Sequence, residues 1–534
     1  MRRYRPEFDL SRLDWILLCI IVLLAAWLRF SRITQVEFLW DQAEISKWAL
    51  RMARQGEMAW VGPRSSTGLY TFPGSIWLLA IPYVLSPSPI VATGFIAALD
   101  VLAVLGCYFL TLRWFGRTAA WAAALLFAVA PWAVIYSRKI WQVELLPLFT
   151  LAYVVTGWWA FVRGRRWAMP VHFLALAAVV QIHFSAFPLI FLTGLWALLF
   201  RRRFDWRLLF VGGALAALTF APYIVFDARH GWWDVRHLVE IVQQPATTSA
   251  DALRDTWIIS TGLDLYWLTG PDRYPDFASA TPNIRWLFAI EGGLIIVGCV
   301  LAVWRAVRRV RVGLDDETAA ALMSATWLMM PSLALTHSTV PPAPHYFTIT
   351  FPAQFILIGW LMVRARHLPG RASQIVHGLF AMLIILLVLT QTHEITSLLR
   401  FVTTHDTRRG YGTPVSYEIQ AAQTAMRLSR EIGDAEVILL SEGDDPRIFE
   451  MPAVADVLMP DTPHRAVDTR GALVFPSSPA VYWATWEMSP GEMLLTDFAP
   501  EVIDERILLR GGARAFRFYL WTINTCVKRV IFMG

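Results

Sequence analysis

Residues 14–44 of the chain are DWILLCIIVLLAAWLRFSRITQVEFLWDQAE. The run from Asp14 to Phe30 is apolar and about as long as one membrane-spanning helix. The segment before it is basic, with Arg2, Arg3, Arg5 and Arg12. No small-residue cleavage site of a signal peptide follows the run. We therefore expect a retained first span with a cytoplasmic N-terminus, and charged residues 37–44 just beyond its outer end.

The composition supports a membrane protein. The 534 residues are 56% hydrophobic and 16% charged, with a mean hydropathy of +0.48, whereas soluble domains carry roughly 25% charge. Further apolar runs lie near residues 90–112, 118–136, 142–162, 168–186, 187–200, 207–226, 286–304, 318–336, 346–363 and 375–393. They predict a mainly α fold, a polytopic transmembrane helical bundle of about eleven spans.

The arginines test this topology, because short cytoplasmic loops collect basic residues. The predicted cytoplasmic loops contain Arg113 and Arg117; Arg163, Arg165 and Arg166; Arg201, Arg202 and Arg203; Arg305, Arg308, Arg309 and Arg311; and Arg364, Arg366 and Arg371. The alternation holds if 168–200 forms two short spans with Pro188 near their outer turn. A single span there would place every later loop on the opposite side of the membrane.

Two domains are expected. Residues 1–396 form the transmembrane domain with long outer loops at 34–89 and 227–285, and residues 397–534 form an extracytoplasmic C-terminal domain. This tail predicts a small α/β fold. Its expected elements are a helix at Ser416–Ile432 and strands at Val437–Leu440, Ala472–Phe475, Val481–Trp486 and Phe516–Trp521.

Several classes of protein are disfavoured. The net charge of +6 is divided among separate clusters, which argues against nucleic acid as a partner. Walker-type and GxGxxG loops are absent from the sequence, so an ATP-driven pump is disfavoured. Cys19, Cys107 and Cys299 sit in apolar runs and Cys526 is alone in the tail. They offer neither a disulfide framework nor a CxxC site.

Two acidic motifs lie on the predicted outer side. Asp41 and Glu44 share a face if a helix begins there, although Asp41 could equally cap the helix and Glu44 complement its dipole. Glu144 lies in the tight turn between the third and fourth spans, near Arg138 and Lys139. It could either have a functional role there or form an ion pair with one of these cations. Together the motifs predict a shared outer-face site with two carboxylates and nearby cations.

Other polar residues have structural alternatives. His345 and Tyr346 follow a proline-rich approach to the tenth span, so His345 could contact a phosphate or cap the span. His183 is expected to pack between helices. Asp100 and Glu291 lie inside spans, and we favour interhelical hydrogen bonding for both. A divalent cation is left open as a cofactor, with Asp41 and Glu144 as its candidate ligands.

The order of these motifs resembles a known family. The motifs are WDQAE at 40–44, GLYTFPG at 68–74, LTLRWFG at 110–116, SRKIWQVELLPLF at 137–149, His345-Tyr346 followed by Pro352, and RGYGTP at 409–414. Over residues 10–395 the chain resembles GT-C glycosyltransferases of the protein O-mannosyltransferase and aminoarabinose transferase type, the glycosyltransferase 39 family. The resemblance implies transfer of a sugar from a polyprenyl-phosphate donor to an acceptor hydroxyl at the outer face, with inversion.

The resemblance also implies roles for site residues. Asp41 would be the general base, Glu44 would bind the acceptor or tune the charge of Asp41, and Glu144 would position the acceptor. Arg138 would bind the donor phosphate, because a guanidinium suits that group. The residues expected to assist in substrate binding are Lys139, His345 and Tyr346. The chain departs from relatives at Gln42, where many have an acid beside the first, and at His345, where they carry arginine.

Two rival functions use other features. A transporter or flippase for a lipid-linked or anionic substrate would use Asp100 and Glu291 as coupling sites, but the chain lacks a detectable internal repeat. A membrane scaffold would use the tail to bind a cell-wall partner. For the glycosyltransferase, the sequence leaves open the sugar and whether the acceptor is a protein, a lipid or a polysaccharide.

Overall fold

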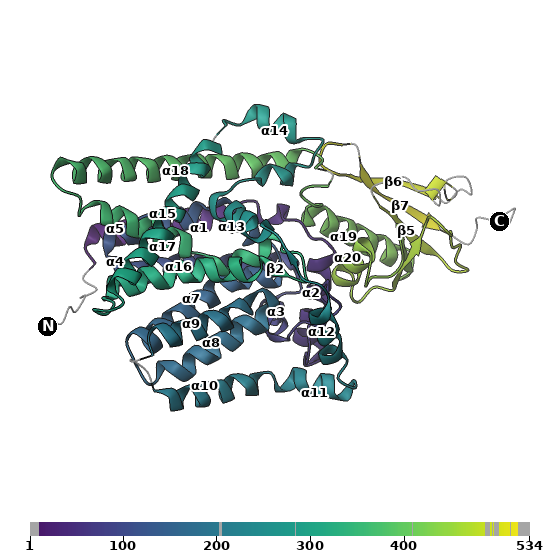
Figure 1. The fold of residues 1–534 in the computed structure, drawn as a ribbon. Coiled ribbons are helices and arrows are strands. Elements are labelled where there is room, and N and C mark those ends of the chain that lie inside the picture. The colour runs from purple at the N-terminus through teal and green to yellow at the C-terminus, as the bar shows by residue number, and fades with distance from the viewer. Residues whose placement is uncertain are drawn as a thin grey trace.

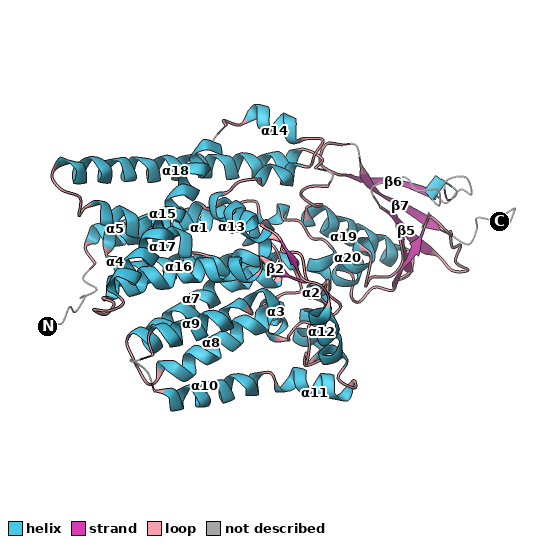
Figure 2. Ribbon diagram, in the orientation of Figure 1, coloured by secondary structure: helices cyan, strands magenta, loops and turns pink. Residues whose placement is uncertain are grey.

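The computed structural model describes residues 10–201, 205–283, 285–407, 409–485, 492–493, 495, 501–512 and 514–521. The chain is mainly helical and has a small mixed sheet near its C-terminal end, as the sequence predicted (Figures 1 and 2). The residues named above that lie outside the described part are Arg2, Arg3, Arg5, Arg202, Arg203, Trp486 and Cys526.

Every predicted span falls on helical structure. The helices concerned are α1 (Arg12–Phe30), α4 (Pro89–Phe115), α5 (Arg117–Val129), α6 (Pro131–Tyr136), α7 (Leu146–Gly157), α8 (Ala168–Ile182), α9 (Pro188–Leu199), α10 (Trp206–Thr219), α11 (Ala221–Arg229), α15 (Arg285–Arg309), α16 (Asp316–Ala334), α17 (Ala353–Ala365) and α18 (Arg371–Thr404). The protein is thus a multi-pass membrane protein.

The helices at the predicted spans differ in length and apolar character. Within the described residues, five helices are long and apolar enough to cross a membrane. The number is up to seven if two bent pairs, α10 with α11 and Pro344–Thr350 with α17, each count as one span. The other predicted spans fall on helices that are shorter or less apolar.

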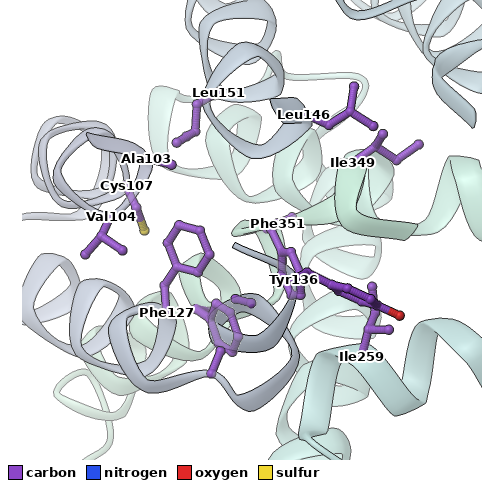
Figure 3. Close-up of a cluster of buried hydrophobic side chains, with 14 of the residues drawn as sticks. Ala103, Val104, Cys107, Phe127, Tyr136, Leu146, Leu151, Ile259, Ile349 and Phe351 are labelled. Atoms are coloured by element: carbon purple, nitrogen blue, oxygen red, sulfur yellow. The ribbon is translucent and has the colours of Figure 1, made fainter. Parts of the chain in front are cut away.

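The centre of the bundle is densely packed. Phe127 of α5 stacks on Phe355 of α17, with ring centroids 5.9 Å apart, within the buried cluster that Figure 3 shows. A Cβ at Gly359 of α17 would lie 2.5 Å from the carbonyl oxygen of Ala119. Glycine is therefore needed for α5 and α17 to approach each other this closely.

The two predicted outer loops form helices of their own. They are α2 (Trp40–Leu50) and α3 (Gly74–Leu85) in the first loop, and α12 (Trp233–Gln243), α13 (Asp251–Thr261) and α14 (Tyr274–Ala280) in the second. The short strands β1 (Thr247–Thr248) and β2 (His337–Ser338) pair nearby. Helices α2, α3 and α12 gather at the end of the bundle that faces the C-terminal sheet (Figure 1). Loop residues far apart in sequence therefore meet there.

The C-terminal region is an α/β layer. Its strands are β3 (Glu436–Ser441), β4 (His464–Asp468), β5 (Ala480–Ala484), β6 (Glu501–Leu508) and β7 (Ala515–Trp521), in the order β4-β3-β5-β7-β6. Strand β3 pairs in parallel with β4 and β5, whereas β7 is antiparallel to β5 and β6. Helices α19 (Val415–Glu431) and α20 (Glu450–Leu458) share a hydrophobic cluster with the sheet.

One predicted strand is wrong. Residues 472–475 lie outside the strands, and Leu473, Val474 and Phe475 pack as a loop against a hydrophobic cluster of the sheet. The edge strand β4 lies at His464–Asp468 instead. An edge strand with a mixed polar sequence gives a weak apolar signal, and a loop that covers a sheet face gives a strong one.

Candidate functional site

A cavity of about 710 Å³ lies where α2, the loops around α3, α12 and the approach to α17 meet. Most of its wall is aromatic or aliphatic. The aromatic lining residues are Trp40, Phe72, Trp141, His183, Phe184, Phe187, Phe191, Tyr223, His345 and Tyr346, and the charged ones are Asp41, Glu44, Arg64 and Asp234. Such a cavity, apolar with a few polar groups, is the usual form of a small-ligand site.

Asp41 and Glu44 both line this cavity, so α2 presents the predicted acidic face to it. The helix begins at Trp40, and Gln42 rather than Asp41 serves its N-terminus by accepting the backbone N–H of Leu39 at 2.8 Å. Glu44 accepts a hydrogen bond from the indole of Trp48 at 2.9 Å. The capping role considered for Asp41 is therefore filled by its neighbour.

The charge of Asp41 is set by its surroundings. Its side chain faces the open cavity. The surrounding protein removes part of the water around the carboxyl, and this desolvation raises its pKa. Lys139 opposes the rise, and the carboxylate of Glu37 adds to it. Lys139 is itself paired with Glu37. A carboxyl with a raised pKa is a stronger base than an ordinary aspartate.

Arg138 is not where its predicted role requires it. It lies outside the cavity lining and is 1% exposed. Its guanidinium donates to the carbonyl oxygens of Leu28, Arg29, Ser31 and Arg32, at 2.6–3.1 Å. Leu28 and Arg29 lie in the last turn of α1, whose last carbonyls have no partner within the helix, and Ser31 and Arg32 follow directly after it. Arg138 therefore caps α1, and we do not retain it as the phosphate ligand.

Glu144 and Lys139 also lie outside the cavity lining. Glu144 is 3% exposed, and its Oε1 lacks a hydrogen-bond partner among the described residues. Asp41 lines the cavity and Glu144 does not, so a substrate in the cavity would not meet both predicted carboxylates. The expected contact of Glu144 with the acceptor stays a prediction that this arrangement does not favour.

His345 and Tyr346 line the cavity beside His183. The His345 ring lies over Trp141, with centroids 4.2 Å apart, and His183 lies 5.7 Å from the ring of Tyr346. The Nδ1 atom of His183 accepts the backbone N–H of Ser185 at 3.1 Å. The neutral ring therefore carries its proton on Nε2, so His183 has a donor available.

Arg64 is the cavity residue that sequence reasoning missed. Among the lining residues it is the only lysine or arginine. Its guanidinium lies 4.6 Å from the ring centroid of Tyr70 and 4.7 Å from that of Trp233. Arg64 stands in a polar loop without a motif, so only the fold, which brings Trp233 of α12 against it, identifies the position.

The two intramembrane acids are engaged in interhelical contacts, as favoured from the sequence. Arg29 of α1 donates its Nε–H to Asp100 of α4 at 2.5 Å, and both side chains are buried. Gln391 of α18 donates to Glu291 of α15 at 2.8 Å. Asp100 therefore pairs with a fixed cation, which weakens the argument for a coupling site.

The described residues offer neither a clustered metal site nor a disulfide. In the part of the chain that the structure describes, no group of three or more His, Cys, Asp or Glu side chains has a geometry suited to a metal ion. Of the cysteines in that part, Cys19, Cys107 and Cys299 are free. The candidate site consists of the acidic face of α2, Asp234 of α12, Arg64 and an aromatic wall.

Neither a family model nor a curated protein matches the chain. Among solved structures, ArnT from Cupriavidus metallidurans in the apo state is similar with a TM-score of 0.57 and 14% identity, over 97% of this chain and 99% of that chain. ArnT bound to undecaprenyl phosphate gives a TM-score of 0.54 at 14% identity, over 96% and 98%. The oligosaccharyltransferase AglB from Archaeoglobus fulgidus, in complex with an inhibitory peptide and a dolichol-phosphate, gives 0.47 at 13%, over 86% and 65%. The chain therefore has the fold of ArnT, which confirms the GT-C-like fold expected from its motifs.

Proposed function

We propose that the protein is a membrane glycosyltransferase that moves a sugar from a polyprenyl-phosphate donor to an acceptor hydroxyl. The observation that carries this proposal is the position of Asp41, a carboxyl with a raised pKa on the wall of an aromatic cavity, in a chain with the ArnT fold. One structure with this fold is bound to undecaprenyl phosphate. A lipid phosphate of that class is the donor carrier that we propose.

In the proposed reaction, Asp41 takes the proton of the acceptor hydroxyl. The hydroxyl oxygen forms a bond to the anomeric carbon while the bond from that carbon to the donor phosphate oxygen breaks. The electron pair leaves with the lipid phosphate. Because attack comes from the face opposite the leaving group, the configuration at the anomeric carbon inverts.

We propose Arg64 as the cation that receives the departing phosphate, because it is the fixed positive charge of the cavity wall. His345 and His183 would add hydrogen bonds, and Tyr346 and Trp141 would hold the sugar ring. Glu44 would contact the acceptor beside Asp41. Lys139 acts through Glu37 and Asp41 in this scheme rather than on the substrate.

The transporter alternative gains less support from the geometry. It needs Asp100 to exchange partners or protons, yet Asp100 is buried against Arg29, whose guanidinium also donates to the carbonyl of Ala128 at 2.7 Å. A fully satisfied pair of this kind stabilises helix packing and has little freedom to exchange.

We further propose the orientation inferred from the arginines, with the N-terminus in the cytoplasm and residues 397–534 outside the membrane. The acidic face of α2 would then meet a donor in the outer leaflet. A reporter enzyme active only outside the cytoplasm, fused after Gly534, should be active, and the same reporter fused after Arg366 should be silent. The reverse pattern would contradict the orientation.

The donor class is tested with purified protein in lipid vesicles. Labelled sugars are offered either on polyprenyl phosphates or on nucleotides, and products are identified by mass. Transfer from a polyprenyl-phosphate sugar, with a mass increase of one sugar residue, is the expected result. Transfer from nucleotide sugars alone would contradict the proposed donor.

A further inference from the structure

Arg64 is carried by a short hairpin, residues 62–71, which we call the Arg64 hairpin. The backbone N–H of Gly62 donates to the carbonyl oxygen of Thr71 at 2.7 Å, and Arg64 and Tyr70 form an antiparallel bridge across it. A single hairpin is only marginally stable alone, so a neighbouring element must fix it. The position of the guanidinium therefore depends on what the hairpin packs against.

The Arg64 hairpin packs against the first turns of α12. The Trp233 ring lies 4.7 Å from the Arg64 guanidinium, and Nε2 of His237 lies 2.9 Å from the carbonyl oxygen of Thr67. The residue after Trp233 is Asp234, whose side chain is 3% exposed and lines the cavity. The helix that fixes the hairpin therefore also places a carboxyl group beside it.

Asp234 is held in the cavity wall by hydrogen bonds. Its Oδ2 accepts the hydroxyl of Tyr223 of α11 at 2.7 Å, and its Oδ1 accepts the backbone N–H of Tyr70 at 3.4 Å. The backbone N–H of Asp234 donates to Oδ1 of Asp227 at 2.8 Å. Two donors to one carboxyl group favour its ionised form. A negative charge is therefore fixed next to the Arg64 hairpin.

The charges of Asp234 and Arg64 act on each other. Burial raises the pKa of the Asp234 carboxyl, and its two hydrogen bonds together with the charge of Arg64 oppose the rise. Among the described residues that line the cavity, Asp41 and Glu44 bring the number of carboxyl groups to three, against one guanidinium. The wall therefore has an excess of carboxyl groups, and one of them lies near its guanidinium.

This charge balance distinguishes two kinds of lipid phosphate. A polyprenyl-phosphate sugar is a phosphodiester with one negative charge. When the bond from its anomeric carbon breaks, the electron pair stays on the phosphate oxygen, and the monoester that remains carries about −1.5 to −2 at neutral pH. Arg64 attracts both lipids and Asp234 repels both. Because each Coulomb energy is proportional to the charge of the ligand, Asp234 disfavours the monoester about twice as strongly as the diester.

We propose that Asp234 is a specificity-determining residue that lets the cavity hold a singly charged lipid phosphodiester and release the more highly charged lipid phosphate formed from it. Asp234 does so by offsetting the charge of Arg64. Without this carboxylate, the guanidinium would hold the leaving lipid phosphate more tightly than the donor, and the product would stay in the cavity. The inference rests on the proposed function for the identity of the lipid.

The test compares the binding of two lipids that share one prenyl chain, polyprenyl phosphate and its methyl phosphodiester. Dissociation constants are measured at pH 8 with the purified protein in nanodiscs of neutral lipid. The wild type should bind the monoester no more tightly than the diester. Asp234→Asn keeps the shape and removes the charge, so it should bind the diester roughly threefold and the monoester roughly tenfold more tightly. Asp234→Glu keeps the charge and should keep the wild-type ratio.

Asp255→Asn is the matched control. Asp255 of α13 is 1% exposed, and its Oδ1 lies 3.3 Å from the guanidinium of Arg254. It is thus a buried carboxyl group beside an arginine, but it lies outside the cavity lining. Its substitution should change neither affinity. A wild type that binds the monoester roughly tenfold more tightly than the diester overturns the proposal, and this comparison needs no variant to fold.

The transfer assay separates this proposal from the proposed function. Added polyprenyl phosphate should inhibit Asp234→Asn more strongly than the wild type. If both lipids bind as predicted but no sugar is transferred, the selection by charge stands and the proposed function fails. If sugar is transferred but Asp234→Asn changes neither affinity, the selection by charge fails and the function stands. Failure of both lipids to bind the wild type contradicts the donor class and this proposal with it.

Discussion

The imidazole of His345 stacks on the indole of Trp141, with ring centroids 4.2 Å apart and ring planes inclined by 35°. Trp141 precedes α7, whereas His345 lies in the helical turn Pro344–Thr350 before α17. The pair therefore joins two distant segments on one wall of the cavity. A flat aromatic surface flanked by a nitrogen donor suits a sugar ring, which presents both C–H and hydroxyl groups.

Replacing Trp141 tests this surface. Trp141→Ala should raise the KM for the donor by roughly three- to tenfold, because an aromatic contact of this kind contributes about 0.5–1.5 kcal/mol. The value of kcat should change less, since the base remains in place. Trp267→Ala removes an exposed tryptophan outside the cavity lining and serves as the control. An unchanged KM in Trp141→Ala would show that the stacked pair does not bind the sugar.

Substitution of Arg138 should affect stability, whereas substitution of Arg64 should affect donor binding. Arg138→Met leaves the end of α1 without its cap, so it should lower the free energy of unfolding by on the order of 3 kcal/mol, with little change of KM in the protein that still folds. Arg64→Met should raise the donor KM and leave thermal unfolding almost unchanged, because Arg64 is exposed to the cavity. Thermal unfolding and transfer kinetics measure both. A KM effect confined to Arg138→Met would restore that residue as the phosphate ligand.

The acid limb of the pH profile reports on Asp41. Burial raises the pKa of Asp41 and Lys139 opposes the rise, so kcat should fall toward acid with a midpoint above the ordinary aspartate value of about 3.9. Lys139→Met removes the opposing cation and should move the midpoint to still higher pH. Lys139→Arg keeps the charge and should leave it in place. A midpoint that ignores Lys139 would mean that another group provides the limb.

Substitution of Asp100 distinguishes an enzyme from a transporter. Asp100→Asn leaves Arg29 without its buried counter-charge, and breaking such a pair costs about 3–5 kcal/mol. We therefore expect a lower unfolding temperature with near-normal kcat per folded molecule. The double variant Arg29→Met with Asp100→Asn should recover part of the stability. Loss of substrate movement across vesicles in Asp100→Asn, with unchanged stability, would favour transport.

Much of the fold follows from the sequence because its signals are local. The apolar run ended by Phe30 predicts α1, and helical spacing places Asp41 and Glu44 on one face of α2. The bends between α10 and α11 and before α17 are not visible in hydropathy, so the sequence did not show which of the predicted spans are bent. The strand β4 was missed for a similar reason, since its pairing with β3 is a long-range contact.

The candidate site was predictable only in part. Asp41, Glu44, His345 and Tyr346 were found from their motifs, and all four line the cavity. Arg138 was assigned to phosphate because of the resemblance and because a guanidinium suits that group, whereas in the fold the guanidinium is taken up by backbone carbonyls at and just after the end of α1. Arg64 has no local signal, because the rings that hold it come from Tyr70 and Trp233. Tertiary contacts decide which cations face the cavity.

The central claim is that Asp41 is the base of a glycosyl transfer reaction. The most direct measurement compares turnover of a labelled polyprenyl-phosphate sugar by the wild type, Asp41→Asn and Asp272→Asn, each in lipid vesicles and each with donor binding measured separately. Asp272 is an exposed acid outside the cavity lining. We predict that Asp41→Asn binds donor normally but loses kcat by roughly a hundredfold or more, the usual contribution of a general base, while Asp272→Asn retains full turnover. Normal turnover by Asp41→Asn would contradict the account and direct attention to Glu144.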